Sequence, residues 1–332
     1  MTQSKRGLIR RSCGTLFLLF LIVAGTIILL RRFQAPMQQN EGFVFGTTYH
    51  IRYKSPTDLH DRIRSVLDQV DASLSLFNKQ STLSKINRGE TDKADVMVEE
   101  VLRLALRISE ETGGAFDVTV APLVNAWGFG TEEQTTLSDG HIDSLRQFVG
   151  YRNLSLSGRT VSKSDKRVQI DCGAIAKGYA VDKVAQLLRE NQVENFMIEI
   201  GGEIVVSGKN DEGESWHIGI EQPDTTNVGG ALQEVVEMTD RAVATSGNYH
   251  NYYVRDGKRV SHTISPQTGR PIVHDLLSAT VVAPTCAEAD AYATACMVMG
   301  AEKSRAFFKN HPKLSAYFIL AGNDGYVTEK IN

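Results

Sequence analysis

Short β-rich runs joined by glycine turns in the second half of the chain constrain its fold more than any other feature. FMIEIGGEIVVSGK holds two such runs around Gly201-Gly202, and YYVRDGKRVSHTI holds two more around Asp256-Gly257. Tight turns of this kind between apolar runs predict β-hairpins. Further strands are predicted at WHIGIEQP, SATVVAP and AYFILAG, the last of them as the final strand. Strands that return on themselves are antiparallel, which favours an α+β class over a doubly wound sheet.

Three segments have the apolar spacing of amphipathic helices, namely residues 59–76, 96–111 and 176–191. The second should end at Gly113-Gly114. The alternating run GFVFGTTYHIRY predicts one strand over residues 42–53, and QID (169–171) predicts a strand end. Residues 78–93 form a polar stretch, and residues 131–146 are predicted to be a polar excursion on the surface.

The first 34 residues differ from the rest of the chain. A basic start is followed by residues 12–30, which are 19 residues without a charge, and then by Arg31 and Arg32. A bilayer core needs about 20 such residues, whereas a cleaved signal peptide has a shorter apolar run and a small-x-small exit. We therefore expect an uncleaved signal anchor in residues 1–34, a linker over 35–41 and one domain over 42–332. The basic residues before the span place the amino terminus in the cytoplasm and the domain outside it. Cys13 precedes the apolar run, which is a poor position for lipoprotein acylation.

Charge and cysteine content exclude two classes of function. A formal net charge of −3 argues against a nucleic-acid-binding surface as the main function. No CxxC motif or Cys/His ligand set occurs, so a structural zinc site is not expected. Cys286 and Cys296 lie about 15 Å apart along one predicted helix, too far for a disulfide. We interpret Cys172, Cys286 and Cys296 as packing residues, with a Cys172–Cys286 bridge as the open alternative.

The segment TCAEADAYATACMVMG (285–300) predicts a helix that carries two oxygen ligands. Thr285 and Glu288 have the spacing of a capping box. Asp290 and Thr294 lie one turn apart on the same face and can present two oxygens to one point. Hard cations such as Mg²⁺ prefer oxygen ligands and usually keep several waters, so two protein oxygens and a carbonyl would suffice. The alternative is an Asp–Thr hydrogen bond in a packed helix.

Three other stretches combine glycine with isolated polar residues. In GGAFDVTVAPLVNAWGFG, Asp117 lies where backbone could approach a ligand closely, or it is a cap in a turn. In IDCGAIAKGYAVD, Lys177 lies at a helix start and could bind an anion. In the alternative interpretation, Asp171 is only a helix cap and Lys177 is a solvated side chain. In HTISPQTGRP, His262 precedes a loop at a strand end, a common place for catalytic groups, although a single histidine is more often structural.

Taken together, five ordered blocks make the chain resemble the ApbE family of flavin transferases, from about Gly42 to Val327. The blocks are GAFDVTVAPLVNAWGFG, IDCGAIAKGYAVDKV, IEIGGEIVVSG, HTISPQTGRPI and CAEADAYATA. The resemblance implies a T-fold-like α+β core of two intertwined subdomains. It also implies Mg²⁺-dependent transfer of FMN from FAD to a threonine hydroxyl of an acceptor protein, with release of AMP.

The resemblance also implies a set of site residues. The metal ligands would be Asp290, Thr294 and the carbonyl of Ala174. Contacts to the flavin would come from Ala115, Phe116, Asp117 and Ile264. Asp171 and Lys177 would face the nucleotide. Phe77 would cover the ligand, at a position where several relatives have Tyr, and Phe45 stands where many relatives have Met. His262 would assist phosphoryl transfer as the proton acceptor, with Asp171 as the other candidate for that role.

Two other functions stay open at this point. If water reaches the phosphorus, the same site would be an FAD pyrophosphatase that yields FMN and AMP, and residues near Phe77 and Asn78 could decide between the two reactions. A membrane-tethered flavin-binding protein without enzymatic activity is the third alternative. An anchor through residues 12–30 would place the domain on the periplasmic side of a bacterial inner membrane. Exported subunits of sodium-pumping quinone reductases or Rnf-type complexes are the acceptors that this location implies.

Overall fold

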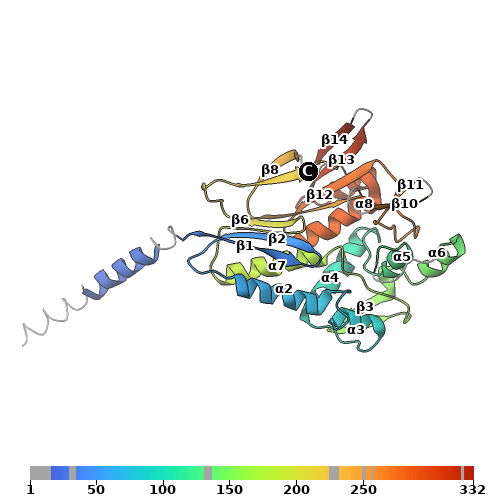
Figure 1. The fold of residues 1–332 in the computed structure, drawn as a ribbon, viewed down its shortest axis with the longest axis horizontal. Helices are drawn as coiled ribbons and strands as arrows, with labels where there is room; N and C mark the ends of the chain where they lie inside the picture. Colours follow the sequence, from blue (N-terminus) through green and yellow to red (C-terminus); the bar gives the residue numbers. More distant parts are fainter. Residues whose placement is uncertain are drawn as a thin grey trace, which may run out of the picture.

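The computed structural model describes residues 16–29, 35–130, 137–223, 232–248, 252–255, 258–322 and 325–332. At its centre is an eight-stranded sheet (Figure 1) whose strand order, β1-β2-β5-β6-β9-β12-β13-β14, follows the order of the chain. All neighbouring strands are antiparallel, which confirms the predicted α+β class. The strands are β1 Met37–Val44, β2 Thr47–Lys54, β5 Phe196–Ile200, β6 Glu203–Ser207, β9 Arg241–Gly247, β12 Leu276–Ala283, β13 Ser315–Gly322 and β14 Gly325–Ile331.

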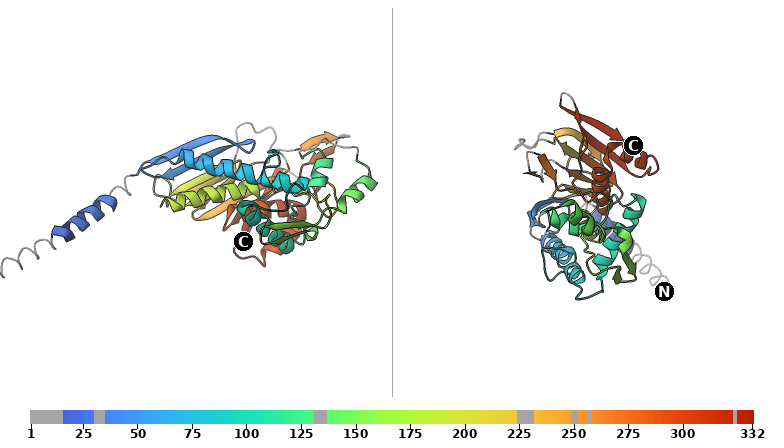
Figure 2. Two further views of the ribbon diagram at one scale, coloured as in Figure 1. Left: turned by 90° about the horizontal axis from the view of Figure 1, so that it is seen from below. Right: turned by 90° about the vertical axis from the view of Figure 1, so that its right-hand side faces the viewer.

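Helices cover one face of this sheet because alternate strand residues are apolar there. In β5, Phe196, Ile198 and Ile200 are fully buried in the main core. Figure 2 shows two of the covering helices, α2 and α7, side by side along the sheet. A third, α8, packs on β9 and β12, and α4 packs against α2 and α8. Their bounds are α2 His60–Leu74, α4 Val96–Glu111, α7 Ala176–Glu190 and α8 Cys286–Phe308.

A hairpin of β7 (Trp216–Glu221) and β8 (Leu232–Met238) covers the other face. The alternation continues through the sheet: Val206 and Val243 point away from the helices and pack against Trp216 and Ile218. In Figure 1 the hairpin lies above β6 and β2, and α7 and α2 lie below them. Both faces of the central strands are therefore buried, and only their ends can reach solvent.

Shorter elements form a region beside the helices. They are α3 Thr82–Arg88, α5 Ala121–Ala126, α6 Asp139–Arg146, the 3₁₀ turn Tyr151–Asn153, the hairpin of β3 Leu154–Ser157 and β4 Thr160–Lys163, and the hairpin of β10 Tyr252–Arg255 and β11 Lys258–Ser261. Leu123, Ile142 and Ile264 form a small apolar cluster of their own here. The main core, in contrast, includes residues from Tyr49 to Ile331. The T-fold relationship and the division into two subdomains stay predictions.

Several predicted elements are confirmed. Helix α4 covers residues 96–111 as expected, and it ends before Gly113 and Gly114, whose φ angles of 60° and 80° suit glycine. Gly201 and Gly202 join β5 to β6. Strands β10 and β11 pair as expected, although the predicted turn residues Asp256-Gly257 lie outside the described residues. The Thr285 hydroxyl accepts a hydrogen bond from the Glu288 amide at 3.3 Å, as the capping box requires.

Other elements correct the sequence prediction. Residues 42–53 are not one strand, because Phe45 (φ 53°) and Gly46 (φ 78°) turn the chain between β1 and β2. Residues 37–41, predicted as a linker, belong to β1. Residues 169–171 are not in a strand, and β13 is not the last strand, because β14 pairs with it. The polar residues 78–93 contain helix α3, and the predicted surface excursion contains α6, with 131–136 outside the described residues.

The structure also describes three cysteines and part of the amino-terminal segment. Cys172, Cys286 and Cys296 are free and buried, which confirms them as packing residues and excludes the Cys172–Cys286 bridge. Residues 16–29 form a helix with mostly exposed apolar side chains. In the part of the chain that the structure describes, no helix has both the length and the apolar character needed to span a membrane. The rest of the predicted anchor lies outside the described residues.

Candidate functional site

Helices α7 and α8 meet at their amino ends, and each one caps the other. The first amides of a helix have no partner within it, so they need an acceptor from elsewhere. The Asp290 carboxylate of α8 accepts a hydrogen bond from the Gly178 amide of α7 at 3.1 Å. In return, the Asp182 carboxylate of α7 accepts from the amides of Cys286 and Ala287 at 2.8 and 2.9 Å. This reciprocal capping fixes the position of Asp290 relative to the start of α7.

Gly178 makes the close approach of the two helices possible. A Cβ atom at this position would lie 2.3 Å from the carbonyl oxygen of Cys286 and 2.8 Å from the amide nitrogen of Ala287. No side chain fits at such distances, so the backbones can touch only because residue 178 lacks one. The predicted anion site at this helix start has fewer open amides than expected, because Ala176 donates to the Cys172 carbonyl and Gly178 donates to Asp290.

The capping carboxylate Asp182 gives a testable dependence of stability on pH. Burial raises its pKa to about 6, although the two amides act in the opposite direction. Because the folded pKa lies above the unfolded value of 3.8, this group stabilises the fold below pH 3.8, and the contribution is lost as the pH rises through about 6. We expect the unfolding free energy of the wild type minus that of Asp182→Asn to fall by about 2 kcal/mol between about pH 4 and pH 7. Urea unfolding at several pH values measures this, and a difference that grows with pH would contradict it.

Two buried carboxylates and one half-buried ammonium lie together where α7 and α8 cover β6. The Lys177 ammonium is paired with the Glu203 carboxylate, whose side chain is 3% exposed. Burial, followed by the nearby charge of Asp290, raises the pKa of Glu203, whereas the Lys177 ammonium acts in the opposite direction. Burial also raises the pKa of Asp290. Burial alone would lower the pKa of Lys177, but the charges of Asp290 and Glu203 outweigh it and raise that pKa.

Oxygen atoms from the same end of the sheet complete the site. The Thr294 hydroxyl lies 3.1 Å from the hydroxyl of Ser246, near the end of β9. Gly201, two residues before Glu203, lies against Thr47, which places the turn of Phe45 beside the turn between β5 and β6. Among the described residues, no group of three or more His, Cys, Asp or Glu side chains could hold a metal ion. A cation beside Asp290 would therefore need hydroxyl, carbonyl and ligand oxygens, which is a donor set that fits Mg²⁺.

The AFD stretch uses its side chains to hold its own loop together. Ala115 and Phe116 are buried, Phe116 in the main core. The oxygens of Asp117 accept hydrogen bonds from the amide and hydroxyl of Thr119 at 2.8 and 2.6 Å and from the Tyr151 amide at 2.6 Å. The carboxylate of Asp117 therefore shapes the loop, and the backbone is what this stretch can offer to a ligand.

Asp171 connects that loop to the turn before α7. Its amide donates to the Val118 carbonyl at 2.7 Å, and its carboxylate accepts from the Gly173 amide at 2.7 Å, one residue before Ala174. Burial raises the pKa of the Asp171 carboxyl. A raised pKa suits a group that must take up a proton near neutral pH, so the alternative of Asp171 as a proton acceptor keeps a physical basis.

His262 begins a loop that follows β11 and passes the end of β9. The next residue, Thr263, donates to the Asn248 side chain at 3.0 Å just beyond β9. The His262 ring is half-buried and meets the Phe129 ring edge-on, with centroids 6.3 Å apart. Ile264 is buried and packs against Leu123 and Ile142, so its side chain serves packing in this structure.

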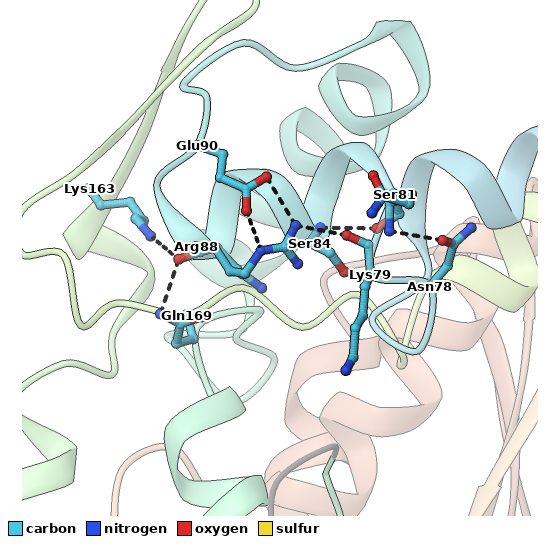
Figure 3. Close-up of polar contacts among 10 residues, drawn as sticks. Asn78, Lys79, Ser81, Ser84, Arg88, Glu90, Lys163 and Gln169 are labelled. Carbon is cyan, nitrogen blue, oxygen red and sulfur yellow. Dashed lines mark hydrogen bonds and ion pairs between the residues drawn. The ribbon is translucent and has the colours of Figure 1, made fainter.

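The loop that carries Phe77 is firmly held although the Phe77 side chain is 84% exposed. Figure 3 shows the polar contacts around it: Asn78 accepts from the Gln80 amide at 3.0 Å, and Arg88 of α3 donates to the Lys79 carbonyl at 2.8 Å. The Asn78 side chain also donates to Asp71 of α2 at 2.8 Å. An exposed aromatic ring on a fixed loop is available to cover a ligand.

The structure thus brings part of the predicted set together. Lys177, Asp290, Thr294 and the Phe45 turn gather at one end of the sheet, and Asp171 and Ala174 lie in the turn that leads to Lys177. The contacts of Asp117, Ile264 and Phe77 are made elsewhere. Sequence reasoning missed Glu203, Ser246 and Gly178. No local signal marks Glu203, because an acid at the start of a strand can lie on either face of the sheet.

Fold and site define a class: an antiparallel α+β protein whose buried cluster of oxygens and charges suits an anionic ligand with a hard cation. The ApbE family model matches residues 45–318, and the chain belongs to the ApbE family. It is 37% identical to the FAD:protein FMN transferase of Vibrio cholerae over 92% of this chain and 95% of that protein. It is 36% identical to the FAD:protein FMN transferase of Escherichia coli K12 over 87% and 85% of the two chains.

Solved structures agree with this assignment. The flavin transferase ApbE from Vibrio cholerae matches with a TM-score of 0.81 over 90% of this chain and 98% of that chain, at 36% identity. The flavinyl transferase ApbE of Pseudomonas stutzeri matches with a TM-score of 0.80 over 90% and 95%, at 33% identity. The likeness in fold therefore extends over most of the chain.

Proposed function

We propose that this protein transfers FMN from FAD to a threonine hydroxyl of an acceptor protein, with Mg²⁺, and releases AMP. The observation that carries the proposal is the cluster of Lys177, Glu203 and Asp290 at the amino end of α7 in a chain of this family. A pyrophosphate needs positive charge around it, and Lys177 and the positive end of a helix supply that charge.

Each residue has a role that its position supports. Asp290, Thr294 and the Ala174 carbonyl would hold Mg²⁺, which when bound would neutralise charge on the pyrophosphate. Lys177 would bind the phosphate oxygens and orient the phosphorus for in-line attack. His262, or Asp171 in its place, would take the proton of the attacking threonine hydroxyl. The backbone of residues 115–117, the Phe45 turn and the Phe77 ring would enclose the flavin.

The location and acceptor are also proposals. A signal anchor formed by residues 12–30 would tether the domain on the periplasmic side of an inner membrane. Exported subunits of sodium-pumping quinone reductases or Rnf-type complexes would then lie within reach. The polar, fixed surface of the Phe77 loop would face such an acceptor while its ring covers the ligand.

Incubation with FAD, Mg²⁺ and an acceptor that carries a D-x-x-[ST]-G-A-T-type sequence tests the function. We expect the acceptor to gain the mass of FMN less one water on its threonine, with an equal amount of AMP, because each transfer breaks the pyrophosphate bond of one FAD and forms one phosphoester. Mass spectrometry of the acceptor and chromatography of the nucleotides measure both products. Free FMN and AMP with an unmodified acceptor would instead indicate a pyrophosphatase, and intact bound FAD would indicate a binding protein. An acceptor with alanine at the threonine position is the matched control.

A further inference from the structure

Glu203 is the buried residue whose position the proposed roles leave unexplained. It begins β6 on the face that the helices cover, and it is 2% exposed. One carboxylate oxygen accepts the Lys177 ammonium, while the other, Oε2, is buried and has no hydrogen-bond partner among the described residues. Burying a carboxylate with an unpaired oxygen costs free energy that an apolar residue would avoid. The fold alone therefore gives no reason for an acid at this position.

The Lys177 ammonium is paired with Glu203, and the charge of the buried Asp290 carboxylate also acts on it. Lys177 directly precedes Gly178, whose amide donates to Asp290, so the backbone at Lys177 lies close to that carboxylate. An ammonium paired with Asp290 would occupy the oxygen that a cation needs and would repel the cation by its charge. In the structure the ammonium is paired with Glu203 instead.

We propose that Glu203 is a positioning residue that holds the Lys177 ammonium away from Asp290 and so keeps the Asp290 carboxylate open to a divalent cation. This inference rests on the divalent-cation site of the proposed function. The Gly178 amide occupies Oδ2 of Asp290, which leaves Oδ1 as the oxygen that the arrangement keeps available. Glu203 thereby also holds Lys177 ready for the phosphate oxygens of a nucleotide.

A competing explanation is that Glu203 attracts the cation directly through its own negative charge. The two explanations differ in their dependence on Lys177. If Glu203 acts through Lys177, removing its charge matters only while the lysine is present. If it acts directly, removing its charge has the same effect with and without the lysine. A double-mutant cycle separates these cases.

The experiment titrates Mn²⁺, as a probe for the divalent site, into the full-length wild type, Glu203→Gln, Lys177→Met and the double variant, without FAD. Calorimetry and the paramagnetic resonance of free Mn²⁺ both report the dissociation constant without any turnover. We expect Glu203→Gln to weaken binding by about 10- to 100-fold, as for other residues that orient a metal ligand. In the Lys177→Met background the same change should alter binding by less than about threefold. Both substitutions keep side-chain length, and thermal unfolding confirms that each variant is folded.

The outcomes separate this inference from the function on which it rests. A wild type that binds no Mn²⁺ would overturn the proposed divalent site and the inference with it. A wild type that binds Mn²⁺, combined with equal effects of Glu203→Gln in both backgrounds, would overturn only the role of Glu203. An effect that is large with Lys177 and small without it supports the inference.

Discussion

Replacing Asp290 with alanine is expected to lower FMN transfer by about 1,000-fold or more. The carboxylate lies at the amino end of α7, near Lys177, and it would be the charged ligand of the proposed set of Asp290, Thr294 and the Ala174 carbonyl. Its loss would remove several kcal/mol of charge stabilisation at the pyrophosphate, and about 4 kcal/mol corresponds to 1,000-fold in rate. The rate of acceptor labelling at saturating FAD and over a range of Mg²⁺ concentrations measures this effect.

Asp182 supplies a matched control, because it is the other carboxylate of the reciprocal caps. Asp182→Asn should destabilise the protein in the same way that any lost helix cap does, by about 1 kcal/mol. It should leave the rate per folded molecule within a few-fold of the wild type, because Asp182 faces the start of α8. If Asp290→Ala retained wild-type labelling at low Mg²⁺, the assignment of Asp290 as the metal ligand would be wrong.

Replacing Gly178 with alanine is expected to destabilise the fold by about 4 kcal/mol. The new methyl group would lie 2.3 Å from a backbone oxygen of α8, and a backbone atom cannot turn away as a side chain can. The helices would have to separate, which combines the cost of overpacking with the loss of the bond between the Gly178 amide and Asp290. Chemical denaturation gives the change in unfolding free energy, and we also expect weaker Mn²⁺ binding because Asp290 moves.

Gly140 in helix α6 is the matched control for this substitution. A Cβ atom there would meet nothing within 4 Å. Alanine is a better helix former than glycine, so Gly140→Ala should be neutral or should stabilise the protein by up to about 1 kcal/mol. Equal effects of the two substitutions would mean that the contact between α7 and α8 does not determine the stability of the site.

Local signals in the sequence explain which parts of the fold could be predicted. Helix α4, the hairpin of β5 and β6 and the cap at Thr285 depend on residues close in the chain, and the structure contains all three. Strand β1 escaped prediction because residues 37–41 are mostly polar and owe their strand conformation to pairing with β2. The turn at Phe45 escaped because an aromatic residue with φ 53° is rare, so nothing in its type signals a turn.

The site residues also fall into two groups, those that a local sequence pattern indicates and those that it does not. The spacing of Asp290 and Thr294 on one helix predicts that both oxygens reach the same point, and the family resemblance implies that they bind a metal ion. Glu203 and Ser246 are brought to them only by the order of strands in the sheet. Gly178 is informative only once α8 is seen against it. Contacts between residues far apart in the chain carry no local pattern, and for that reason this half of the site could not be predicted.

Neighbouring strands of the sheet follow one another in the chain, so they are also synthesised in that order. The residues of the site are therefore made at different times during synthesis. The partners Lys177 and Glu203 both precede residue 207, so the charge pair can form early. Asp290 and Thr294 arrive only with α8, which follows β12 in the chain and packs on β9 and β12, strands that have already been made. A growing chain can therefore pair Lys177 with Glu203 before it gains the residues proposed to hold a cation.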